Sequence, residues 1–483
     1  MDFISLRKQY KEFVYKGFSC EVQEGFYVVT YAYEIPGLSE FETMWKFPDA
    51  GRPVDEKIFN RLLFELGMAE AISYWKVTCA PTLKVACGSL TEWQNQWWRK
   101  LFYNGLGEFM YVNGIEVSEE ELLTIVCEPG TYAGVAHADG VAGEDAGVAA
   151  GGKARGERFR GVFAGKLTDT ASYAGCLVPV GGGKDSVVSM EVLRDEDVTI
   201  YRINKDATVE NVLAAADREY KTCFVNRKLD PRILEMNQRG FLNGHIPFSA
   251  VVAFSTFISA YLQGLRYIAL SNESSANEST VVGSFVNHQY SKSYEFEQDF
   301  MEYIHSFLET DIRYFSLLRP LSELQIAALF AQYTKYHKAF RSCNAGSKKG
   351  IWCCNCPKCL FVYIILSSFL SEEEKVAIFG ENLLDNPQNE KYFRELTGLD
   401  ENKPFECVGT RSEVVMSLKK YLEKCRATDA AGAQGKAAYL AEKYADWLME
   451  QPGDVDMALL EWNELHNVPE ELLFRLELEL GRK

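Results

Sequence analysis

From Cys176 onward the hydrophobic and polar positions alternate between two patterns. Short apolar runs such as "CLVPV", "VTIYRI", "RYIALS" and "RYFSLL" are typical of buried strands. Longer runs lie among them, such as "DSVVSMEVL", "TVENVLAAADREY" and "SELQIAALFAQYTKYHKAF", and these are typical of helices. Strands that alternate with helices predict a parallel, doubly wound α/β sheet, which binds its ligands at the carboxyl ends of the strands.

The rest of the chain follows other patterns. The first part mixes strand-like runs such as "FYVVTYAYEI" with helical ones and predicts a smaller α/β or α+β domain. Its helix over "SLTEWQNQWWRKLFYN" is expected to begin with a capping box of Ser89 and Glu92. A Gly- and Ala-rich stretch then predicts a flexible linker or insertion, because it cannot bury enough surface to offset its ordering entropy. The predicted divisions are an N-terminal domain at 1–131, the linker at 132–170, the α/β domain at 171–342, a Cys-rich helical region at 343–425 and an acidic helical tail at 426–483.

Composition and charge narrow the class of protein. A chain of 483 residues with 47% apolar positions predicts several globular domains. The formal net charge of -17 argues against nucleic acid as a partner, because such binding needs Lys and Arg at the surface. The most apolar windows are short or contain Ser, Thr and Gln, so no membrane segment is expected. Thirteen cysteines, an odd number, and no signal-peptide pattern in "MDFISLRKQY" favour a reducing cytoplasm.

The stretch "VPVGGGKDS" places a glycine run between a predicted strand and a predicted helix, where backbone N–H groups can hold a phosphate. A Walker A loop is excluded because Asp185 follows the lysine and Val178 stands where the first glycine belongs. A Rossmann loop is excluded because Ser186 replaces its last glycine. The stretch is close to the S-G-G-x-D-S loop of the PP-loop ATP pyrophosphatases, with Gly181 in place of the first serine.

This likeness implies a domain of PP-loop (HUP-like) type that cleaves ATP between its α and β phosphates. The amides of Gly182 and Gly183 and the hydroxyl of Ser186 would hold the pyrophosphate. Lys184 would neutralise it, and Asp185 would orient the loop or bind Mg²⁺. The alternative is an ordinary glycine-rich turn between a strand and a helix.

Further motifs follow in a fixed order along the chain: "NGHIP", "SNE", "VNHQYSKS", "LRPLSEL", "WCCNCPKC" and "KPFECVG". With the glycine loop, this order resembles the MurL family, the UDP-N-acetyl-α-D-muramoyl-L-alanyl-L-glutamate epimerases of peptidoglycan synthesis. The resemblance extends into the first domain through "ISYWK" and "GLGEF" and reaches about residue 420. It covers neither the Gly- and Ala-rich linker nor the acidic tail.

The resemblance implies a cytoplasmic enzyme that inverts the terminal L-glutamate of a UDP-linked muramoyl dipeptide to D-glutamate, with ATP converted to AMP and pyrophosphate. An α-proton beside a carboxylate is hard to remove, because the carbanion would share its charge with an anion. An acyl-adenylate removes that charge. Because this glutamate is N-acylated, its adenylate could also close to an oxazolone, whose ring proton is labile.

Proton transfer needs a base within hydrogen-bond reach of the substrate. His288 is the first candidate, followed by Lys292, Glu273 and Cys343, with His245 also considered. Asn243, His245, Asn272 and Asn287 are candidates for substrate binding. For His288 a structural role is as well supported as a catalytic one, and for His245 a turn before a helix is favoured.

The cysteines of "SCNAGSKKGIWCCNCPKC" are a separate signal. Cys353, Cys356 and Cys359 form a C-x-x-C-x-x-C run, with Cys343 upstream and Cys354 as an alternative member. Three or four thiolates at this spacing predict a closed, structural zinc site, and an iron–sulfur cluster is less favoured. The alternative is a set of free buried thiols.

Two other functions remain open at this point. One is another PP-loop adenylating ligase of the deazaguanine-nitrile synthase type, in which a similar cysteine cluster occurs; dependence on ammonia would identify it. The other is a non-catalytic adenine-nucleotide sensor, which would release no pyrophosphate in the presence of the right substrate.

Overall fold

The computed structural model describes residues 1–128, 165–277, 287–430 and 436–482. The chain divides into two compact units, each made of several segments. Unit 1 comprises Met1–Ala174, Cys223–Ile268 and Gln298–Arg313, and unit 2 comprises Gly175–Thr222, Ala269–Glu297 and Tyr314–Lys483. The predicted linker at 132–170 lies outside the described residues up to residue 164.

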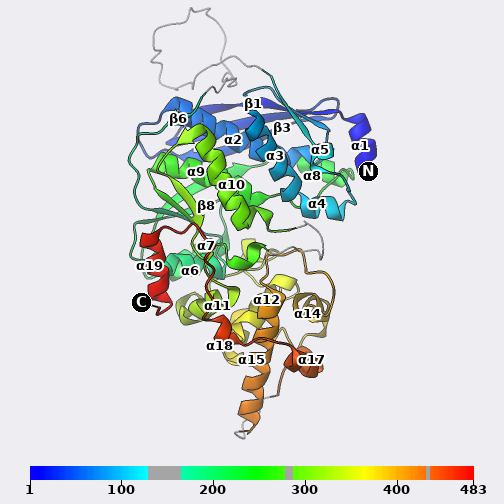
Figure 1. Cartoon of the computed structure of the whole chain (residues 1–483), viewed down its shortest axis with the longest axis vertical. Helices are drawn as coiled ribbons and strands as arrows, with labels where there is room; N and C mark the ends of the chain where they lie inside the picture. The colour runs from blue at the N-terminus through cyan, green and yellow to red at the C-terminus, as the bar shows by residue number, and fades with distance from the viewer. Residues whose placement is uncertain (129–164, 278–286, 431–435, 483) are drawn as a thin grey trace, which may run out of the picture. The chain divides into compact units, whose positions relative to one another are not determined.

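Unit 1 combines helices with a mixed sheet in the order β9-β3-β2-β1-β4-β5 (Figure 1). Its elements are α1 (Phe3–Gln9), β1 (Glu12–Gln23), β2 (Phe26–Ile35), β3 (Ser39–Pro48), α2 (Glu56–Trp75), β4 (Thr82–Val85), α3 (Glu92–Gly105), α4 (Gly107–Val112), α5 (Glu119–Leu122), β5 (Thr124–Cys127), β6 (Leu167–Thr168), most of β9 (Lys221–Lys228), α8 (Arg232–Gln238), α9 (Phe248–Gln263), most of α10 (Tyr294–Phe307) and β11 (Leu308–Glu309). β1, β2 and β3 form an antiparallel meander, and β4 and β5 continue the sheet in parallel register.

The meander begins with a tight hairpin. Glu24 and Gly25 connect β1 to β2 and both have positive φ, +51° and +77°, as a two-residue type I′ turn requires. Close packing then brings α2 onto the sheet. The Tyr33 hydroxyl donates to the carbonyl of Gly67 at 2.7 Å, and a Cβ at Gly67 would lie 1.9 Å from the Tyr15 hydroxyl oxygen. Only glycine permits this approach at position 67.

The polar contacts of β9 explain why Cys223–Ile268 belongs to unit 1. Residues Met44–Lys46 of β3 pair with Asn226–Lys228 of β9 in antiparallel register. Arg227 donates twice to the buried carboxylate of Glu70, at 2.6 and 2.7 Å, and Trp45 Nε1 donates to the same carboxylate at 2.8 Å. The predicted α/β domain at 171–342 is therefore not one continuous unit in the structure.

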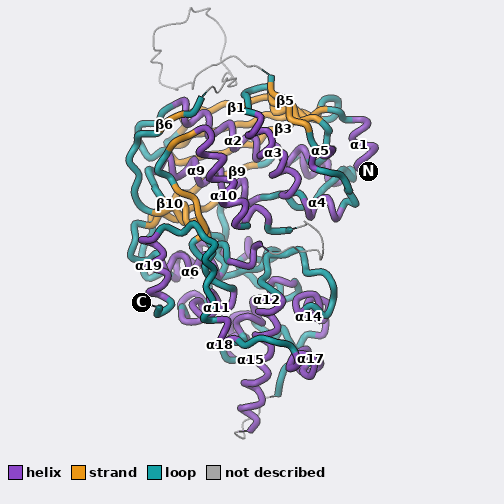
Figure 2. Tube along the Cα trace, viewed as in Figure 1, coloured by secondary structure: helices purple, strands orange, loops and turns teal. Residues whose placement is uncertain are grey.

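Unit 2 contains the strand and helix alternation that the sequence predicts (Figure 2). Its elements are β7 (Cys176–Pro179), α6 (Lys184–Val192), β8 (Val198–Ile203), α7 (Ala207–Ala215), part of β10 (Tyr267–Leu270), the 3-10 turns η1 (Ser274–Asn277) and η2 (Tyr290–Lys292), most of β12 (Arg313–Ser316), α11 (Glu323–Gln332), α12 (Pro357–Leu366), α13 (Glu372–Phe379), α14 (Glu390–Thr397), α15 (Arg411–Ala430), α16 (Tyr439–Lys443), α17 (Ala445–Glu450), α18 (Val455–Ala458) and α19 (Glu470–Glu479).

The strands of unit 2 follow the order β12-β10-β7-β8, and β7 and β8 are parallel. α11 packs against α6, while α12, α14 and α15 pack against one another. The described part of the tail contains α16, α17, α18 and α19, and α17 and α18 pack on α15. The mixed α/β class is thus confirmed.

The predicted start of α3 is wrong by two residues. The structure forms its capping box with Thr91 and Gln94, not with Ser89 and Glu92. Thr91 Oγ1 accepts from the Gln94 amide at 3.2 Å, and Gln94 Oε1 accepts from the Thr91 amide at 3.0 Å. Gln94 is buried and also donates to Ser306, so tertiary contacts select this one of two overlapping capping patterns.

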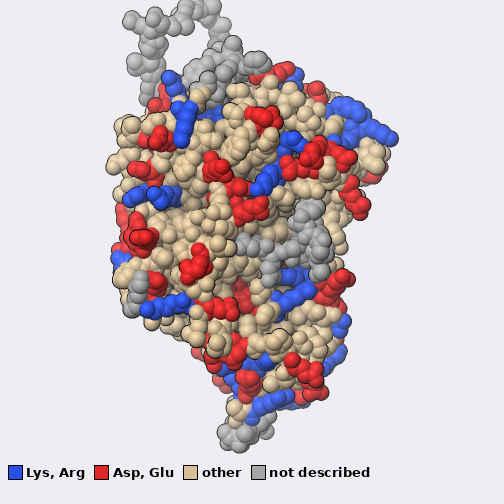
Figure 3. All heavy atoms as spheres, viewed as in Figure 1, with Lys and Arg blue, Asp and Glu red and all other residues tan. Residues whose placement is uncertain are grey.

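Across the described ranges, no helix combines the length and the apolar character that a membrane crossing requires. On the face drawn in Figure 3, the Lys and Arg side chains that the structure describes are interspersed with Asp and Glu.

Candidate functional site

The glycine loop lies where the sequence predicts it, between β7 and the first turn of α6 in unit 2. Gly182 has φ +78°, and a Cβ there would lie 2.6 Å from Thr208 Cγ2, so this position requires glycine. A Cβ at Gly183 would lie 3.0 Å from Ser342 Oγ. Around Gly181 nothing comes within 4 Å of a Cβ, so a side chain has room where related loops carry serine.

The start of α6 offers donors to an anion. The N-cap residue of α6 is Gly183, which has no side chain to accept a hydrogen bond from the helix. The first N–H groups of α6 therefore need other acceptors. The Lys184 amide donates to Ser342 Oγ at 3.3 Å, and the Ser186 hydroxyl donates to the Gly183 carbonyl at 2.9 Å. Such a helix start favours a negatively charged ligand.

Lys184 does not point into open solvent. Its side chain is 2% exposed, and its ammonium pairs with the carboxylates of Asp185 and Glu323. Burial alone would lower the pKa of Lys184, but these two carboxylates raise it above its ordinary value. The lysine charge therefore pairs with one buried carboxylate, that of Glu323, and with the Asp185 carboxylate, whose side chain is 33% exposed.

The "SNE" residues follow β10 and lie in unit 2. Asn272 Nδ2 donates to Ser316 Oγ at 3.0 Å, and the buried Glu273 carboxylate accepts from Ser275 Oγ at 3.1 Å. Arg319 connects this loop to η2, because its guanidinium donates to the carbonyls of both Glu273 and Lys292. Arg319 is fully buried. The sequence analysis quoted it only within "LRPLSEL" and assigned it no role.

The "VNHQYSKS" residues bring a further group into the site. Lys292 Nζ donates to Cys407 Sγ at 3.0 Å, and His288 is hydrogen-bonded to the same thiol. Burial alone would lower the pKa of Lys292, but Cys407 and Glu273 raise it above its ordinary value. The Asn287 Oδ1 atom accepts from the Gln289 amide at 2.7 Å and shapes the turn. Cys407 was not among the predicted site residues, although it lies in the quoted "KPFECVG".

Two of the predicted substrate residues lie in unit 1. Asn243 Oδ1 accepts from Lys76 Nζ at 3.1 Å, and the Gly244 carbonyl accepts from the same ammonium at 2.6 Å. Burial lowers the pKa of Lys76 to about 8. His245 Nδ1 lies 3.6 Å from a carboxylate oxygen of Glu108. The sequence offered no direct signal for Lys76, which is one lysine within "ISYWK".

The four predicted metal cysteines come together in unit 2. The sulfurs of Cys343, Cys353, Cys356 and Cys359 all lie within 4.8 Å of one another. The Cys353 and Cys359 sulfurs are 3.7 Å apart, near the ~3.8 Å expected for two thiolates on a tetrahedral zinc ion with Zn–S bonds of about 2.3 Å. The donor set therefore fits a tetrahedral metal.

Backbone amides support this group of sulfurs. The Gly346 amide donates to Cys343 Sγ at 3.2 Å, and the Cys359 amide donates to Cys356 Sγ at 3.4 Å. Cys354 does not belong to the group, because its thiol donates to the Phe379 carbonyl at 3.3 Å. The alternative that includes Cys354 is thus excluded by the direction of its side chain.

Comparison with known proteins gives a consistent family. The family model described as the MurL N-terminal domain matches residues 5–317, and the model of the MurL C-terminal domain matches residues 337–446. A protein of Xanthomonas oryzae pv. oryzae, named UDP-N-acetyl-alpha-D-muramoyl-L-alanyl-L-glutamate epimerase, is 31% identical over 81% of this chain and 82% of its own length. A protein of the same name from Salinispora tropica is 38% identical over 53% of this chain and 57% of its own length.

No solved structure matches the chain. The family models nevertheless cover both units, including the glycine loop and the four clustered cysteines. The chain belongs to the MurL family.

Proposed function

We propose that this protein epimerises the terminal L-glutamate of UDP-N-acetylmuramoyl-L-alanyl-L-glutamate to D-glutamate for peptidoglycan synthesis. Family membership supports the substrate and the reaction class, because relatives that align with the chain carry this name. The observation that carries the mechanism is the glycine loop at the start of α6, in the same unit as the carboxylates, Lys292 and Cys407. A UDP-linked substrate, as the names of the relatives give it, supports a cytoplasmic location for the reaction.

The loop supports a reaction driven by ATP, in a domain of PP-loop type. The amides of Gly182 and Gly183 and the start of α6 would hold the pyrophosphate part of ATP. Ser186 would add its hydroxyl oxygen, and the partly exposed Asp185 carboxylate would hold Mg²⁺. Lys184 would mainly hold the Asp185 and Glu323 carboxylates in place, because its ammonium already contacts both.

ATP then activates the α-carboxylate of the substrate glutamate as an adenylate and releases pyrophosphate. Activation removes the negative charge that opposes formation of a carbanion at the α-carbon. His288, Lys292 and Glu273 lie in the same unit as the loop and are the candidates to move the α-proton. Cys343 is better explained as a metal ligand, since its sulfur belongs to the four-cysteine group.

The four cysteines support a structural zinc ion. Four thiolates in tetrahedral arrangement close the coordination sphere, so the metal would stabilise the fold and leave no position for substrate. Cys356 immediately precedes α12 and Cys343 lies in the preceding loop, so the ion would tie this loop to the helix.

The experiment incubates the full-length protein with Mg²⁺, ATP and UDP-MurNAc-L-Ala-L-Glu in heavy water. AMP, pyrophosphate and deuterium at the glutamate α-carbon are followed together. We expect all three, with a D-configured product, and a D185A variant that releases little AMP. Epimerisation without AMP would remove the role of ATP, and the absence of both AMP and exchange from a folded sample would contradict the proposal.

A further inference from the structure

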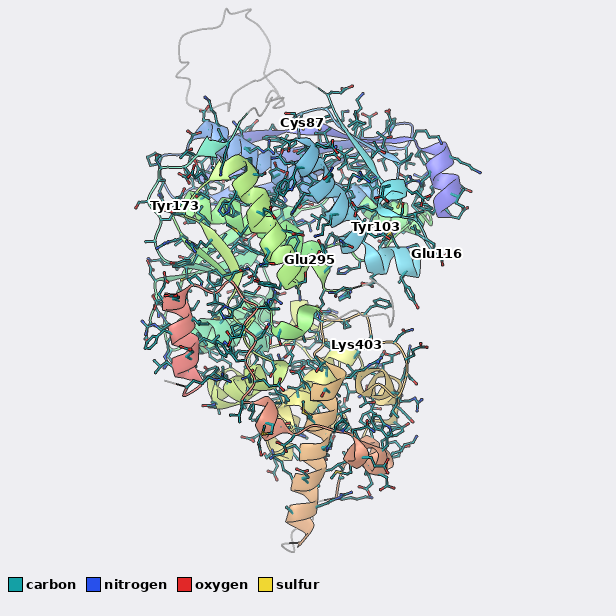
Figure 4. All side chains as sticks on the ribbon, in the orientation of Figure 1. Cys87, Tyr103, Glu116, Tyr173, Glu295 and Lys403 are labelled. Atoms are coloured by element: carbon teal, nitrogen blue, oxygen red, sulfur yellow. The ribbon has the colours of Figure 1, made fainter. Side chains whose placement is uncertain are left out.

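The segment between α14 and α15 holds one cysteine in a fixed, charged environment. Lys403 Nζ donates to the Gly409 carbonyl at 3.0 Å and closes the loop that carries Cys407; Lys403 is labelled in Figure 4. Glu406 accepts a hydrogen bond from the Asn344 side chain, which ties the same loop to the segment that follows Cys343. These two hydrogen bonds fix the loop before and after Cys407, which is itself half-buried.

The groups around this thiol are mostly cationic or hydrogen-bond donors. They are Lys292 in η2, His288 just before η2 and Lys358 in the first turn of α12, with the Glu406 carboxylate immediately before Cys407 in the chain. Burial alone would raise the pKa of Cys407, but Lys292, Lys358 and His288 together hold it at about 5. Cys407 is therefore a thiolate at neutral pH, stabilised by the Lys292 ammonium 3.0 Å away.

Three buried cysteines elsewhere in the chain show the opposite behaviour. Burial raises the pKa of Cys20, Cys176 and Cys223 to about 12. Such thiols behave as small apolar side chains. Reactive cysteines, in contrast, occur in partly exposed, electropositive surroundings, and Cys407 has both properties.

Charged groups connect the Cys407 thiolate to the glycine loop. Lys292 is under the electrostatic influence of both Glu273 and Asp185, and Asp185 belongs to the loop itself. Arg319 bridges the backbone carbonyls of Glu273 and Lys292 and so ties these two backbone segments together. The thiolate therefore belongs to the cluster of charged groups beside the loop.

We propose that Cys407 is a covalent catalyst that accepts the activated glutamyl group from the adenylate as a thioester. The proposal rests on the proposed function. The Cys407 sulfur attacks the carbonyl carbon of the glutamyl adenylate, a C–S bond forms, and the C–O bond to the phosphate breaks so that AMP leaves with that electron pair. Water later attacks the thioester carbon, the C–S bond breaks, and the thiolate is regenerated beside a carboxylate product, with release of two protons.

A nucleophilic role suits this thiolate better than a role as the base. The best general base has a pKa near the working pH, whereas a thiolate with a lowered pKa is a strong nucleophile but a weak base. The thioester keeps the glutamyl carbonyl uncharged, so the α-proton stays acidic after AMP has left. A second group then moves the proton, and His288 is placed for this by its hydrogen bond to Cys407.

The first test needs neither ATP nor substrate. Iodoacetamide labels the full-length protein between pH 5 and pH 9, and peptide mass spectrometry measures the rate at Cys407 and at Cys425. We expect Cys407 to react at pH 6, where an ordinary cysteine with a pKa of about 8.5 is less than about 1% thiolate. Cys425, a half-buried cysteine of α15, is the internal comparison. A Cys407 labelling midpoint near pH 8.5 would overturn the proposal.

Lys292 variants show whether the ammonium stabilises the thiolate. K292M is expected to slow Cys407 labelling at pH 6 by about tenfold or more, since each unit of pKa changes the thiolate fraction about tenfold. K292R keeps a positive charge and should restore most of the rate. Circular dichroism confirms that each variant is folded. An unchanged rate of Cys407 labelling in folded K292M would contradict stabilisation of the thiolate by Lys292.

The second test looks for the thioester. With Mg²⁺, ATP and UDP-MurNAc-L-Ala-L-Glu, intact mass spectrometry after rapid acid quenching should show the protein increased by the substrate mass less one water. C407A should show no adduct and lose α-deuterium exchange by a factor of about 100 or more. It should still form a hydroxamate with hydroxylamine, because adenylation precedes the thioester. C425A should retain the adduct and the exchange.

The outcomes separate the two proposals. Normal turnover by C407A, or loss of exchange in C407A without any adduct on the native protein, overturns the covalent role and leaves ATP-driven epimerisation standing. Absence of AMP formation by the native protein overturns the proposed function and the thioester with it.

Discussion

Lys184 and Glu323 form a buried ion pair across 139 residues of sequence, between the first turn of α6 and the first turn of α11. Asp185 shares the same ammonium. The lysine of the glycine loop thus joins two helices of unit 2, and the loop conformation depends on their packing.

K184M should therefore destabilise the protein. It leaves a buried carboxylate without its partner, which costs about 3–5 kcal/mol of unfolding free energy. K184M/E323Q removes both charges and should recover part of this loss. Urea unfolding followed by fluorescence measures the difference. K221M removes an exposed pair with Asp197 and should change stability by less than about 0.5 kcal/mol. Equal effects of K184M and K221M would contradict the buried pair.

The two glycines at the loop should respond differently to alanine. G182A introduces a Cβ at φ +78° against Thr208, so we expect it to distort the loop and weaken binding of Mg-ATP by about tenfold or more. G181A has open space and should bind nearly normally. Isothermal titration calorimetry measures both. Weak binding in G181A but not in G182A would show that nucleotide does not use this loop as proposed.

Zinc content should follow the cysteine geometry. C353A or C356A removes one of four clustered sulfurs and should reduce bound zinc from about one ion per chain to a small fraction, with a lower Tm. C354A is the matched control, because that thiol contacts the Phe379 carbonyl instead. Inductively coupled plasma mass spectrometry of the purified full-length protein measures the zinc content. Equal zinc in all three variants would exclude this site.

The buried Lys76 should make stability depend on pH. Its pKa is about 8 in the folded protein and about 10.4 when unfolded, so between these values the unfolded chain binds more protons. Its contribution to the unfolding free energy therefore rises with pH by up to about 3 kcal/mol across this range. K76M lacks this contribution. Urea titrations at pH 7.5 and pH 10 should give a smaller rise for K76M than for the native protein, and an equal rise would contradict the assignment.

Several features could be predicted from the sequence because they depend on near neighbours. The alternation of apolar runs located β7, α6, β8, α7, β10, β12 and α11, but α7 ends at Ala215 and α11 at Gln332, well before the predicted ends at Tyr220 and Phe340. The C-x-x-C-x-x-C spacing, with Cys343, located four sulfurs that the structure brings together. In both cases the pattern lies within a short stretch of chain, and local periodicity or spacing is sufficient.

Only the tertiary structure decided which residues far apart in the sequence come into contact. Arg227 and Glu70, 157 residues apart, join β9 to α2 and draw Cys223–Ile268 into unit 1. Lys292 and Cys407, 115 residues apart, become an ion pair only when η2 and the loop before α15 pack together. No sequence period relates such residues, because strand order and helix packing determine which distant side chains meet. Chemistry that depends on charge pairing, such as the thiolate at Cys407, is therefore visible only in the folded chain.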